Sequence, residues 1–532
     1  MNTTIYFRFV ALFVAAFFSL LHPMASVKSD RRFNVVRVFP GDLSGDGLQV
    51  YERIRELHQA AFLLGEDTRV EYPHKMEVDI EIPSGATPIP LTRNTDFNGC
   101  TFCVENTSVD NLFLFSMDRR NDLQDNETVE FETLAQAARR ITVSGDIIDG
   151  GDFSSMSVLA QGHKLLYVYD SLEWSTRRNL KIYRRDIIHI VDGKAQNRPI
   201  QPYTNSAGLI CLYDDVDENV APSFENLSFR RQSSSSKRTF LLKANGQIGL
   251  QIRGIGIYTP REDSTQTERP IYGFDQCLYV RHSVNTLFED IHVDGTYSAK
   301  ASPGYALRMI NLANTSIREI RADGAWGVTC GFYLNSVTLD GCVINRFDCH
   351  CYCADFVYRN CTICTGTEYF LGNSYCQLAN AHGYMFFSHC RFVGVRPIVI
   401  DSSYSTAFSG FELIYQDCDF ELSSQFYYLL EGLTYDDSVS QRSLPNLKLR
   451  DCRFCLPDNF PPNRICLFHF NNQADVGLYR DTVEYLTHVD VENVRILPES
   501  KSSVPVFLCN KNLTYRQDFT SRVLNSSFDA LR

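Results

Sequence analysis

The sequence predicts an all-β fold, a right-handed parallel β-helix (solenoid) with an N-terminal capping α-helix. A short strand-like phrase recurs along most of the chain, and helical periodicity is missing between its copies. A single amphipathic segment precedes the first repeats, where the open end of a solenoid needs a cover.

The recurring phrase is a small or polar residue, an apolar residue, any residue and a second apolar residue. Its copies begin at Gly99, Asn226, Gly254, Asp290, Glu319, Gly341, Asn360, His389, Asp417, Asp451 and Asn493. From Leu227 to Val494 the central apolar residues are separated, by subtraction of residue numbers, by 28, 36, 29, 22, 19, 29, 28, 34 and 42 residues. Such spacings indicate stacked units joined by loops of varying length. The β-branched and aromatic residues alternate with a period of two, which disfavours a βαβ fold.

The chain holds 18 cysteines, a number that favours disulfides in an exported protein. Five of them occupy the central position of successive phrases: Cys342, Cys361, Cys390, Cys418 and Cys452. The same position stacks from rung to rung in a solenoid, and a buried free cysteine behaves as a small apolar residue. We therefore expect these five side chains to form an internal ladder of thiols, outside any disulfide framework.

One helix is predicted near the N-terminus. Its apolar face is formed by Val50, Ile54, Leu57, Ala61 and Leu64, at alternating spacings of four and three. Asp46 is placed to cap the start of this helix, and Gly65 ends it. An amphipathic helix at this place would cover the first rung.

The order of these features predicts the domain organisation. Residues 1–26 have the basic, apolar and small-residue regions of a secretory signal, which predicts a secreted, periplasmic or cell-surface location. Residues 27–75 then hold a strand and the capping helix, and residues 76–500 the parallel β-helix. Within it, the segment from about 112 to 222 fits the repeat poorly and predicts irregular rungs or an inserted β-rich lobe. Residues 501–532 form a C-terminal tail or cap.

The composition limits which classes of partner the protein can bind. The net charge of -12 makes a nucleic-acid partner a poor match, and the segment after residue 26 contains no apolar run long enough for a transmembrane helix. The negative charge does not exclude an acidic glycan as partner, because binding depends on the potential in one cleft and not on the total charge. The sequence requires no cofactor, leaves Ca²⁺ open, and does not determine the oligomeric state.

Several segments resemble a known family. Gly41-Asp42-Leu43-Ser44-Gly45-Asp46-Gly47 is similar to the GDG-type phrase that precedes the capping helix in the pectate-lyase-like superfamily. Further segments resemble secreted β-helix proteins of gut Bacteroidetes, related to bacterial and phage polysaccharide-degrading β-helices: Arg184-Arg185-Asp186 through Asn197-Arg198-Pro199-Ile200, Asp294 to Ser298, Ala325 to Val328, Asn345 to His350, and Ser402-Ser403-Tyr404. The resemblance covers most of the chain and implies the fold. Its functional implication is broad, because this scaffold carries lyases, hydrolases, epimerases and binding proteins.

The segment from Arg346 to Cys353 contains the candidate site. In an extended strand, Phe347, Cys349, Cys351 and Cys353 face one side, and Arg346, Asp348, His350 and Tyr352 face the other. The apolar set suits the core, so the second set is predicted to line an outer groove. A zinc site is disfavoured, because the cysteines alternate one by one and His350 points away from them. A plain polar strand surface is the structural alternative.

His350 is the expected catalytic base, because its ordinary pKa near 6.5 permits proton transfer at neutral pH, with Asp348 orienting the ring. Trp326, Asp401 and Tyr404 are predicted to bind substrate beside this row. Trp326 offers a flat face for a sugar ring, although a packed core aromatic is an equal alternative. Asp401 and Tyr404 have a polar turn as their alternative.

Three functions remain open at this point. The leading one is a polysaccharide lyase that cleaves a uronate-containing glycan by β-elimination, with His350 or Tyr352 as base and Arg346 neutralising the acid. A glycoside hydrolase needs two carboxyl groups, for which Asp348 and Asp401 are the best pair. A noncatalytic glycan-binding or adhesive β-helix is the third.

Overall fold

The computed structural model describes residues 27–29, 34–65, 67–118, 139–143, 145–177, 180–203, 209–216, 221–231, 237, 239–258, 277–294, 305–323, 327–344, 347–364, 376–378, 381–393, 398–401, 411–423, 427–433, 442–443, 445–460, 464–470, 483–484, 488–509 and 519–531. At some positions within these strands, among them Asp348, His350 and Asp401, the description covers the backbone and not the side chain. No helix in these ranges is both long and apolar enough to cross a lipid bilayer.

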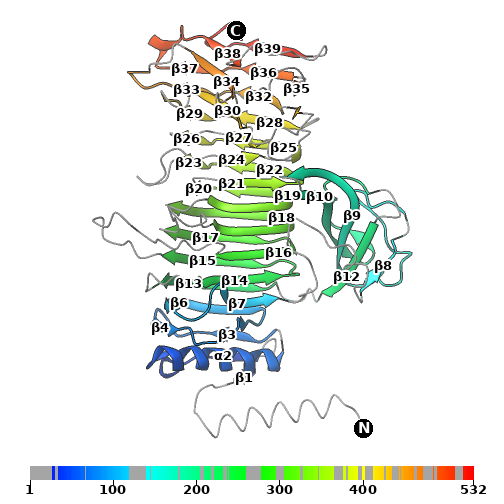
Figure 1. Ribbon diagram of the computed structural model, residues 1–532, viewed down its shortest axis with the longest axis vertical. Helices are drawn as coiled ribbons and strands as arrows, with labels where there is room; N and C mark the ends of the chain where they lie inside the picture. Colours follow the sequence, from blue (N-terminus) through cyan, green and yellow to red (C-terminus); the bar gives the residue numbers. More distant parts are fainter. Residues whose placement is uncertain are drawn as a thin grey trace.

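The chain winds into a long coil of mostly parallel strands, which confirms the predicted solenoid (Figure 1). The strands stack in three columns, each strand pairing in parallel with the equivalent strand one turn later. The first column contains β2 (Asn34–Arg37), β3 (Arg69–Glu71), β6 (Asn94–Glu105), β13 (Ser223–Arg231), β15 (Gln251–Tyr258), β17 (Leu287–Asp294), the later parts of β18 (Tyr305–Asp323) and β19 (Gly327–Asp340), β22 (Cys353–Arg359), β25 (Ala381–Ser388), β28 (Glu412–Gln416), β32 (Asn446–Arg450), β36 (His488–Glu492) and β39 (Thr520–Leu524).

The other two columns complete each turn. The second contains β4 (Glu77–Glu81), the ends of β6, β13, β15, β17 and β18, and then β20 (Val343–Ile344), β23 (Thr362–Cys364), β26 (Arg391–Val393), β29 (Asp419–Glu421), β33 (Arg453–Cys455) and β37 (Arg495–Leu497). The third contains β5 (Ile89–Pro90), β7 (Leu112–Asp118), β14 (Thr239–Asn245), β16 (Leu278–Val284), the starts of β18 and β19, β21 (Phe347–Cys351), β24 (Cys376–Leu378), β27 (Ile398–Asp401), β30 (Tyr428–Leu433), β34 (Ile465–Phe470) and β38 (Val506–Cys509).

The recurring phrase marks the corner between the first and second columns. The first residue of each phrase from Asn226 to Asn493 has a left-handed backbone, with φ between 52° and 65°. Asn, Asp and Gly tolerate this conformation best, which explains the small or polar position in the sequence. The corner side chains also bond between rungs, as Asn360 Nδ2 donates to Asp340 Oδ1 at 2.9 Å and Asn493 Nδ2 to Asp451 Oδ1 at 2.9 Å.

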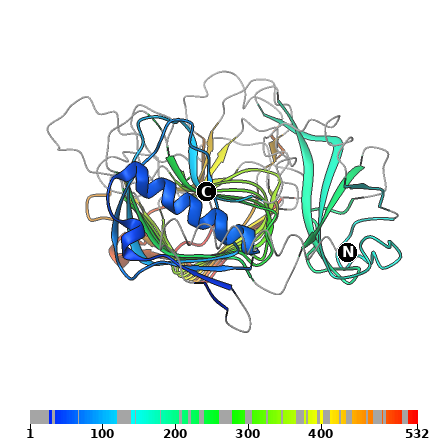
Figure 2. The same cartoon turned by 90° about the horizontal axis from the view of Figure 1, so that it is seen from below.

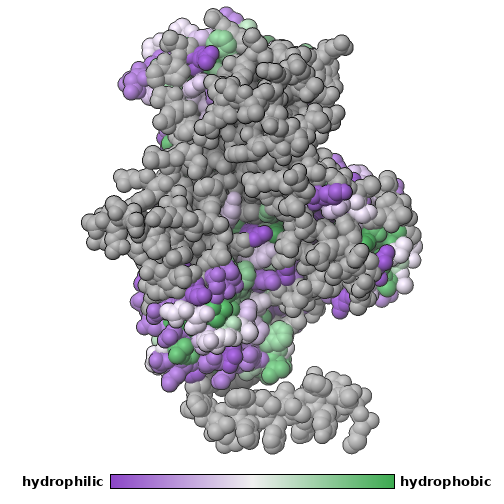
Figure 3. All heavy atoms as spheres, viewed as in Figure 1, coloured by the Kyte–Doolittle hydropathy of each residue, from purple (hydrophilic) through white to green (hydrophobic). Residues whose placement is uncertain are grey.

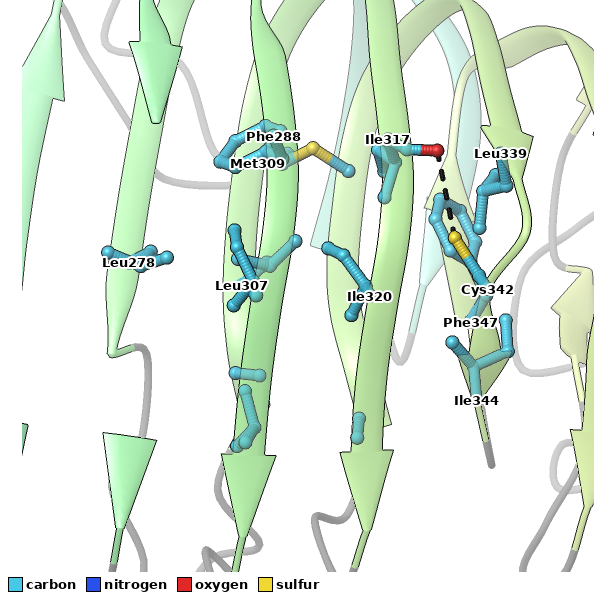
Figure 4. Packing of buried hydrophobic residues seen from close by; sticks show 14 of the residues in the cluster. Leu278, Phe288, Leu307, Met309, Ile317, Ile320, Leu339, Cys342, Ile344 and Phe347 are labelled. Atoms are coloured by element: carbon cyan, nitrogen blue, oxygen red, sulfur yellow. Dashed lines mark hydrogen bonds between the residues drawn. The ribbon is translucent and has the colours of Figure 1, made fainter. Parts of the chain in front are cut away.

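The residue after each corner points into the core. Leu227, Ile255 and Ile291 stack in register across neighbouring strands and are buried. The five predicted cysteines continue the same line, all of them buried and outside disulfides, which confirms the ladder. Figure 4 shows Cys342 within this core among isoleucine, leucine and phenylalanine side chains.

The predicted helix is α2 (Gly47–Leu64), and it lies across the first rung (Figure 2). The Asp46 side chain accepts hydrogen bonds from the Leu48 and Gln49 amides, at 3.1 and 3.4 Å, and Gly65 ends the helix with φ 130°. Val50, Ile54, Leu57 and Ala61 are buried against the core, and Leu64 packs partly against it. The helix is preceded by β1 (Val27–Ser29), antiparallel to β2, and the 3-10 helix η1 (Pro40–Leu43).

Between β7 and β13 the chain leaves the coil and forms a second body, here called the lobe. Its antiparallel sheet has the order β11 (Lys194–Ala195), β10 (Leu180–Val191), β9 (His163–Arg177), β12 (Leu209–Val216) and β8 (Arg140–Ile141). The lobe stands beside the middle of the coil in Figure 1 and to one side of it in Figure 2, and β10 contacts β16 and β18. The remaining elements are the pair β31 (Arg442–Ser443) and β35 (Val483–Glu484), and η3 (Glu499–Lys501).

Charged side chains stack along the outer surface of the coil. Arg253 lies between Glu225 and Glu289, at N–O distances of 4.0 and 3.0 Å, and Arg318 follows at 3.7 Å from Glu289. Each exposed pair contributes about 0–1 kcal/mol, so their alternation in sign favours the correct strand register more than it adds stability. Hydrophilic side chains cover much of the lower end of the coil in Figure 3.

Candidate functional site

The strand that carries the candidate site, β21, lies in the third column of the coil. Phe347 and Cys349 are fully buried in the core, and Cys353 at the start of β22 is buried with them. This confirms the inward half of the predicted alternation at these three positions. Asp348 and His350 occupy the intervening positions of the strand, and their side chains lie outside the described part of the structure.

The pairing of β21 with β19 is irregular at His350. Gly331 pairs with Cys349, but the next residue, Phe332, pairs with Cys351, so His350 is the extra residue of a bulge. A β-bulge redirects side chains locally and is often found beside active sites. The strict alternation on which the outer row was predicted is therefore interrupted at His350.

Tyr352 was predicted to face solvent with His350, and this prediction is wrong. Its side chain is fully buried and belongs to an apolar cluster that contains Phe332 and Tyr333 of the coil and Ile182 of the lobe. The lobe covers this part of the coil. A side chain that points away from the coil core here is therefore still buried, between the coil and the lobe. The backbone of Tyr352 is left-handed, with φ 46°, and follows the bulge directly.

The other predicted site residues are placed only in part. Arg346, Trp326 and Tyr404 lie outside the described residues. Asp401 ends β27, and its side chain is likewise outside the description. Leu378 on β24 pairs with both Cys349 and Ile400, so Ile400 lies in register with Cys349 two rungs away. Asp401 is the residue after Ile400, and His350 is the residue after Cys349. At a strand separation of about 4.8 Å, the two backbones are about 10 Å apart.

A polar cluster that the sequence argument missed lies beside Tyr352. Asp186 on β10 is buried, and its carboxylate accepts hydrogen bonds from the Tyr203 hydroxyl at 2.6 Å and the Ile200 amide at 3.2 Å. Burial raises the pKa of Asp186 from its usual value of 3.8 to about 7, against the lowering effect of these hydrogen bonds and of Arg184. This carboxyl group therefore gains and loses its proton near neutrality.

Two phenols connect Asp186 to the coil. The Tyr203 hydroxyl, which donates to Asp186, also interacts with the hydroxyl of Tyr352. Burial raises the pKa of both phenols well above their ordinary value of 10, so both stay protonated at neutral pH. The arrangement is a short chain of proton-carrying groups from the lobe to the residue that follows β21.

An ion pair borders this chain. Arg184 donates to Asp170 Oδ2 from Nε at 3.2 Å and from Nη2 at 2.7 Å, and its guanidinium lies 4.5 Å from the centre of the Tyr203 ring. Asp170 is buried, and the Arg184 side chain is mostly buried. A buried charge is stable only when it is paired, so the pair fixes the position of Tyr203 beneath Arg184.

Three further contacts hold the lobe against the coil. The guanidinium of Arg185 lies 3.8 Å from the centre of the Tyr333 ring, a cation–π contact in a buried setting. Arg198 forms an ion pair with the buried Asp355 of the coil, and its carbonyl accepts a hydrogen bond from Asn335 Nδ2 at 2.7 Å. These contacts join segments far apart in the sequence.

Asp355 is itself packed against a glycine one rung later. A Cβ on Gly383 would lie 2.0 Å from Asp355 Oδ1, and Gly383 has φ 73°. Both the close approach and the left-handed backbone therefore require glycine at this position.

Two of the segments that carry the family resemblance, Arg184-Arg185-Asp186 and Asn197-Arg198, contribute polar contacts between the lobe and the coil. A run of two arginines and an aspartate before an apolar strand was the available signal for this cluster. Their partners Tyr333, Tyr352 and Asp355 lie more than a hundred residues away, so sequence spacing alone does not predict the pairing.

Among the described side chains, no group of three or more His, Cys, Asp or Glu is arranged to hold a metal ion. The side chains of His350 and Cys351, two members of the zinc site weighed in the sequence analysis, lie outside the described part of the structure.

Comparisons with known proteins give distant similarities in structure. No protein-family model matches the chain, and no curated protein matches its sequence. Among solved structures, the Pseudomonas phage phi297 tailspike is similar at 11% identity and TM-score 0.40, over 86% of this chain and 77% of that one. A tailspike mutant of E. coli bacteriophage HK620, in complex with a hexasaccharide, is similar at 8% identity and TM-score 0.33, over 91% and 76%.

The catalytic domain of a GH87 α-1,3-glucanase, in complex with tetrasaccharides, is similar at 9% identity and TM-score 0.31, over 73% of this chain and 91% of that one. At such identities and scores, no residue role or activity is transferred to this chain.

Proposed function

We propose that this protein is exported and cleaves a uronate-containing extracellular polysaccharide by β-elimination, with the glycan bound over β21 beside the lobe. The observation that carries the proposal is the bulge at His350, two residues before Tyr352, where the chain of Asp186, Tyr203 and Tyr352 ends. An ordinary surface strand needs neither a bulge nor a neighbouring carboxyl group that titrates near pH 7.

The reaction assigns a task to each group. His350 removes the proton from the sugar carbon beside the carboxylate, and Arg346 neutralises that carboxylate and the negative charge that develops on it. The electron pair of the broken C–H bond forms a carbon–carbon double bond while the glycosidic C–O bond breaks. The departing oxygen takes up a proton, and the products are a new chain end and an unsaturated uronate.

The buried cluster does not contact the sugar, and its contribution to the reaction is indirect. Asp186, Tyr203 and Tyr352 are all closed to solvent, so none of them touches a bound glycan in this conformation. Tyr352 is therefore withdrawn as a candidate base. We assign to this cluster the positioning of the backbone that leaves β21.

A hydrolase that uses Asp348 and Asp401 is the alternative. Asp348 is in register with Val399 through Gln377, so Asp401 lies two rungs away and two residues further along the strand. Strand spacing and rise place the two backbones about 12 Å apart, and paired carboxyl groups of glycosidases are about 5–9.5 Å apart.

The test is digestion of a panel of pectins, alginates and glycosaminoglycans, followed by the absorbance of unsaturated uronate products. The wild-type protein should produce this absorbance on at least one glycan, and His350→Ala should abolish it without changing thermal stability. His389→Ala is the control, because His389 is an exposed histidine at a corner between the first and second columns of the same coil and should leave turnover unchanged. Glycan affinity without any product would identify a binding protein, and full activity of His350→Ala would place the base elsewhere.

A further inference from the structure

The five stacked cysteines form a continuous column that the proposed cleavage reaction does not use. Cys342, Cys361, Cys390, Cys418 and Cys452 lie on five successive turns of the coil. The carbonyl of each cysteine from Cys342 to Cys418 accepts a hydrogen bond from the residue after the next cysteine, at 2.8–2.9 Å. The ladder is therefore in register, with one thiol on every rung and no rung skipped.

Each thiol of the ladder is beside another thiol. Cys361 interacts with Cys342 and Cys390, and Cys418 with Cys390 and Cys452. The thiols also donate to backbone carbonyls near the corner, as Cys361 Sγ does to Arg359 O at 3.1 Å. Cys342 Sγ makes the equivalent contact with Asp340 O at 3.5 Å, and Figure 4 shows its second contact, with the Ile317 carbonyl of the preceding rung at 3.6 Å. None of the five is in a disulfide.

We propose that this cysteine ladder binds soft univalent cations, Cu⁺ or Ag⁺, in linear two-coordinate sites between the thiols of successive rungs. Cysteine sulfur is the protein ligand that soft ions of this kind prefer. No oxygen or nitrogen ligand is required, and the ladder, buried in the apolar core, is suited to a bare ion with two sulfur ligands.

The rung spacing fits such a site. Neighbouring strands are separated by about 4.7–4.9 Å. A metal–thiolate bond is about 2.3 Å long in zinc sites, so two such bonds end to end span about 4.6 Å. A linear sulfur–metal–sulfur unit therefore bridges one rung to the next without moving the strands. Zn²⁺ is excluded from these gaps, because it takes four ligands and each gap offers two sulfurs.

The charge balance also suits a univalent ion. When the cation binds, one of the two thiols loses its proton to solvent and the other keeps it. Two metal–sulfur bonds form, one S–H bond breaks, and no electron is transferred. The product carries no net charge, which matters because an unpaired charge in the core is strongly unfavourable.

Two double variants with the same substitutions separate the ladder from the other thiols. Cys361→Ala with Cys418→Ala leaves Cys342, Cys390 and Cys452, no two of which are on successive rungs. Cys342→Ala with Cys452→Ala removes as many thiols but leaves three on successive rungs, with two intact gaps. All cysteines outside the ladder are the same in both variants, so the silver that they bind does not contribute to the difference between the variants.

The experiment titrates the full-length protein with Ag⁺ in chloride-free buffer, and measures silver retained after gel filtration and the melting temperature. The end variant should retain more silver than the alternating variant, and should keep a silver-dependent rise in melting temperature that the alternating variant loses. X-ray absorption on the silver-loaded wild type, which does not depend on either variant folding, should show two sulfur neighbours. Equal silver retention by the two variants, no retention by the wild type, or oxygen and nitrogen neighbours would overturn the proposal.

Discussion

Replacing Asp186 by Asn should change how the stability of the lobe depends on pH. Burial raises the pKa of this carboxyl group from 3.8 to about 7, so the folded protein favours the neutral acid. Stability is therefore retained at low pH and lost as pH rises from the unfolded value near 4 through about 7. A rise of about three pH units corresponds to about 4 kcal/mol, of which about 3 kcal/mol falls between pH 5 and pH 8.

Asn keeps the shape of Asp186 and an oxygen that accepts from the Tyr203 hydroxyl, but it does not ionise. Relative to the wild type, Asp186→Asn should thus gain stability steadily from pH 5 to pH 8. Hydrogen exchange of the β9 and β10 amides measures this locally, without requiring two-state unfolding of the whole chain. Asp215→Asn is the control, because Asp215 is an exposed carboxylate on β12 of the same lobe. Parallel stability curves for Asp186→Asn and the wild type would refute the assigned pKa.

Three further substitutions test the fold around the site. Gly383→Ala should lower the melting temperature by several degrees, because the new Cβ would meet Asp355 Oδ1. Gly85→Ala is the control, since Gly85 has φ 76° and open space around it, and it should cost only about 1 kcal/mol of backbone strain. Equal effects of the two substitutions would contradict the close packing at Gly383. Asp46→Ala should lower the free energy of unfolding by about 1 kcal/mol in urea titration, and no change would show that the cap is dispensable. Arg198→Met should leave a buried carboxylate without its cation and speed proteolysis of the lobe, and an unchanged cleavage rate would show that the remaining contacts suffice.

The coil could be predicted because one local rule repeats on every turn. A left-handed corner favours Asn, Asp or Gly, which occupy all of these positions from Asn226 to Asn493 except Glu319 and His389, and the next residue is apolar because it enters the core. Leu227 and Cys452 follow this rule although they lie many rungs apart. The capping helix was equally local, since Asp46 and Gly65 act on residues within one helical turn.

The site could be predicted only where it depends on local alternation. Phe347 and Cys349 are inside, as the period of two requires. The bulge at His350 depends on the pairing of β21 with β19, which the sequence of one strand does not contain. Tyr352 was misjudged because its buried cluster includes a residue of the lobe, Ile182, about 170 residues earlier in the chain.

The central claim is cleavage by elimination, and the isotope content of the products tests it most directly. Digestion of the active glycan in water enriched in heavy oxygen, read by mass spectrometry, follows whether solvent oxygen enters the new chain ends. Elimination breaks the glycosidic bond without adding water, so we predict unsaturated products that carry no solvent oxygen. Saturated products with one heavy oxygen at each new reducing end would establish hydrolysis and contradict the assignment.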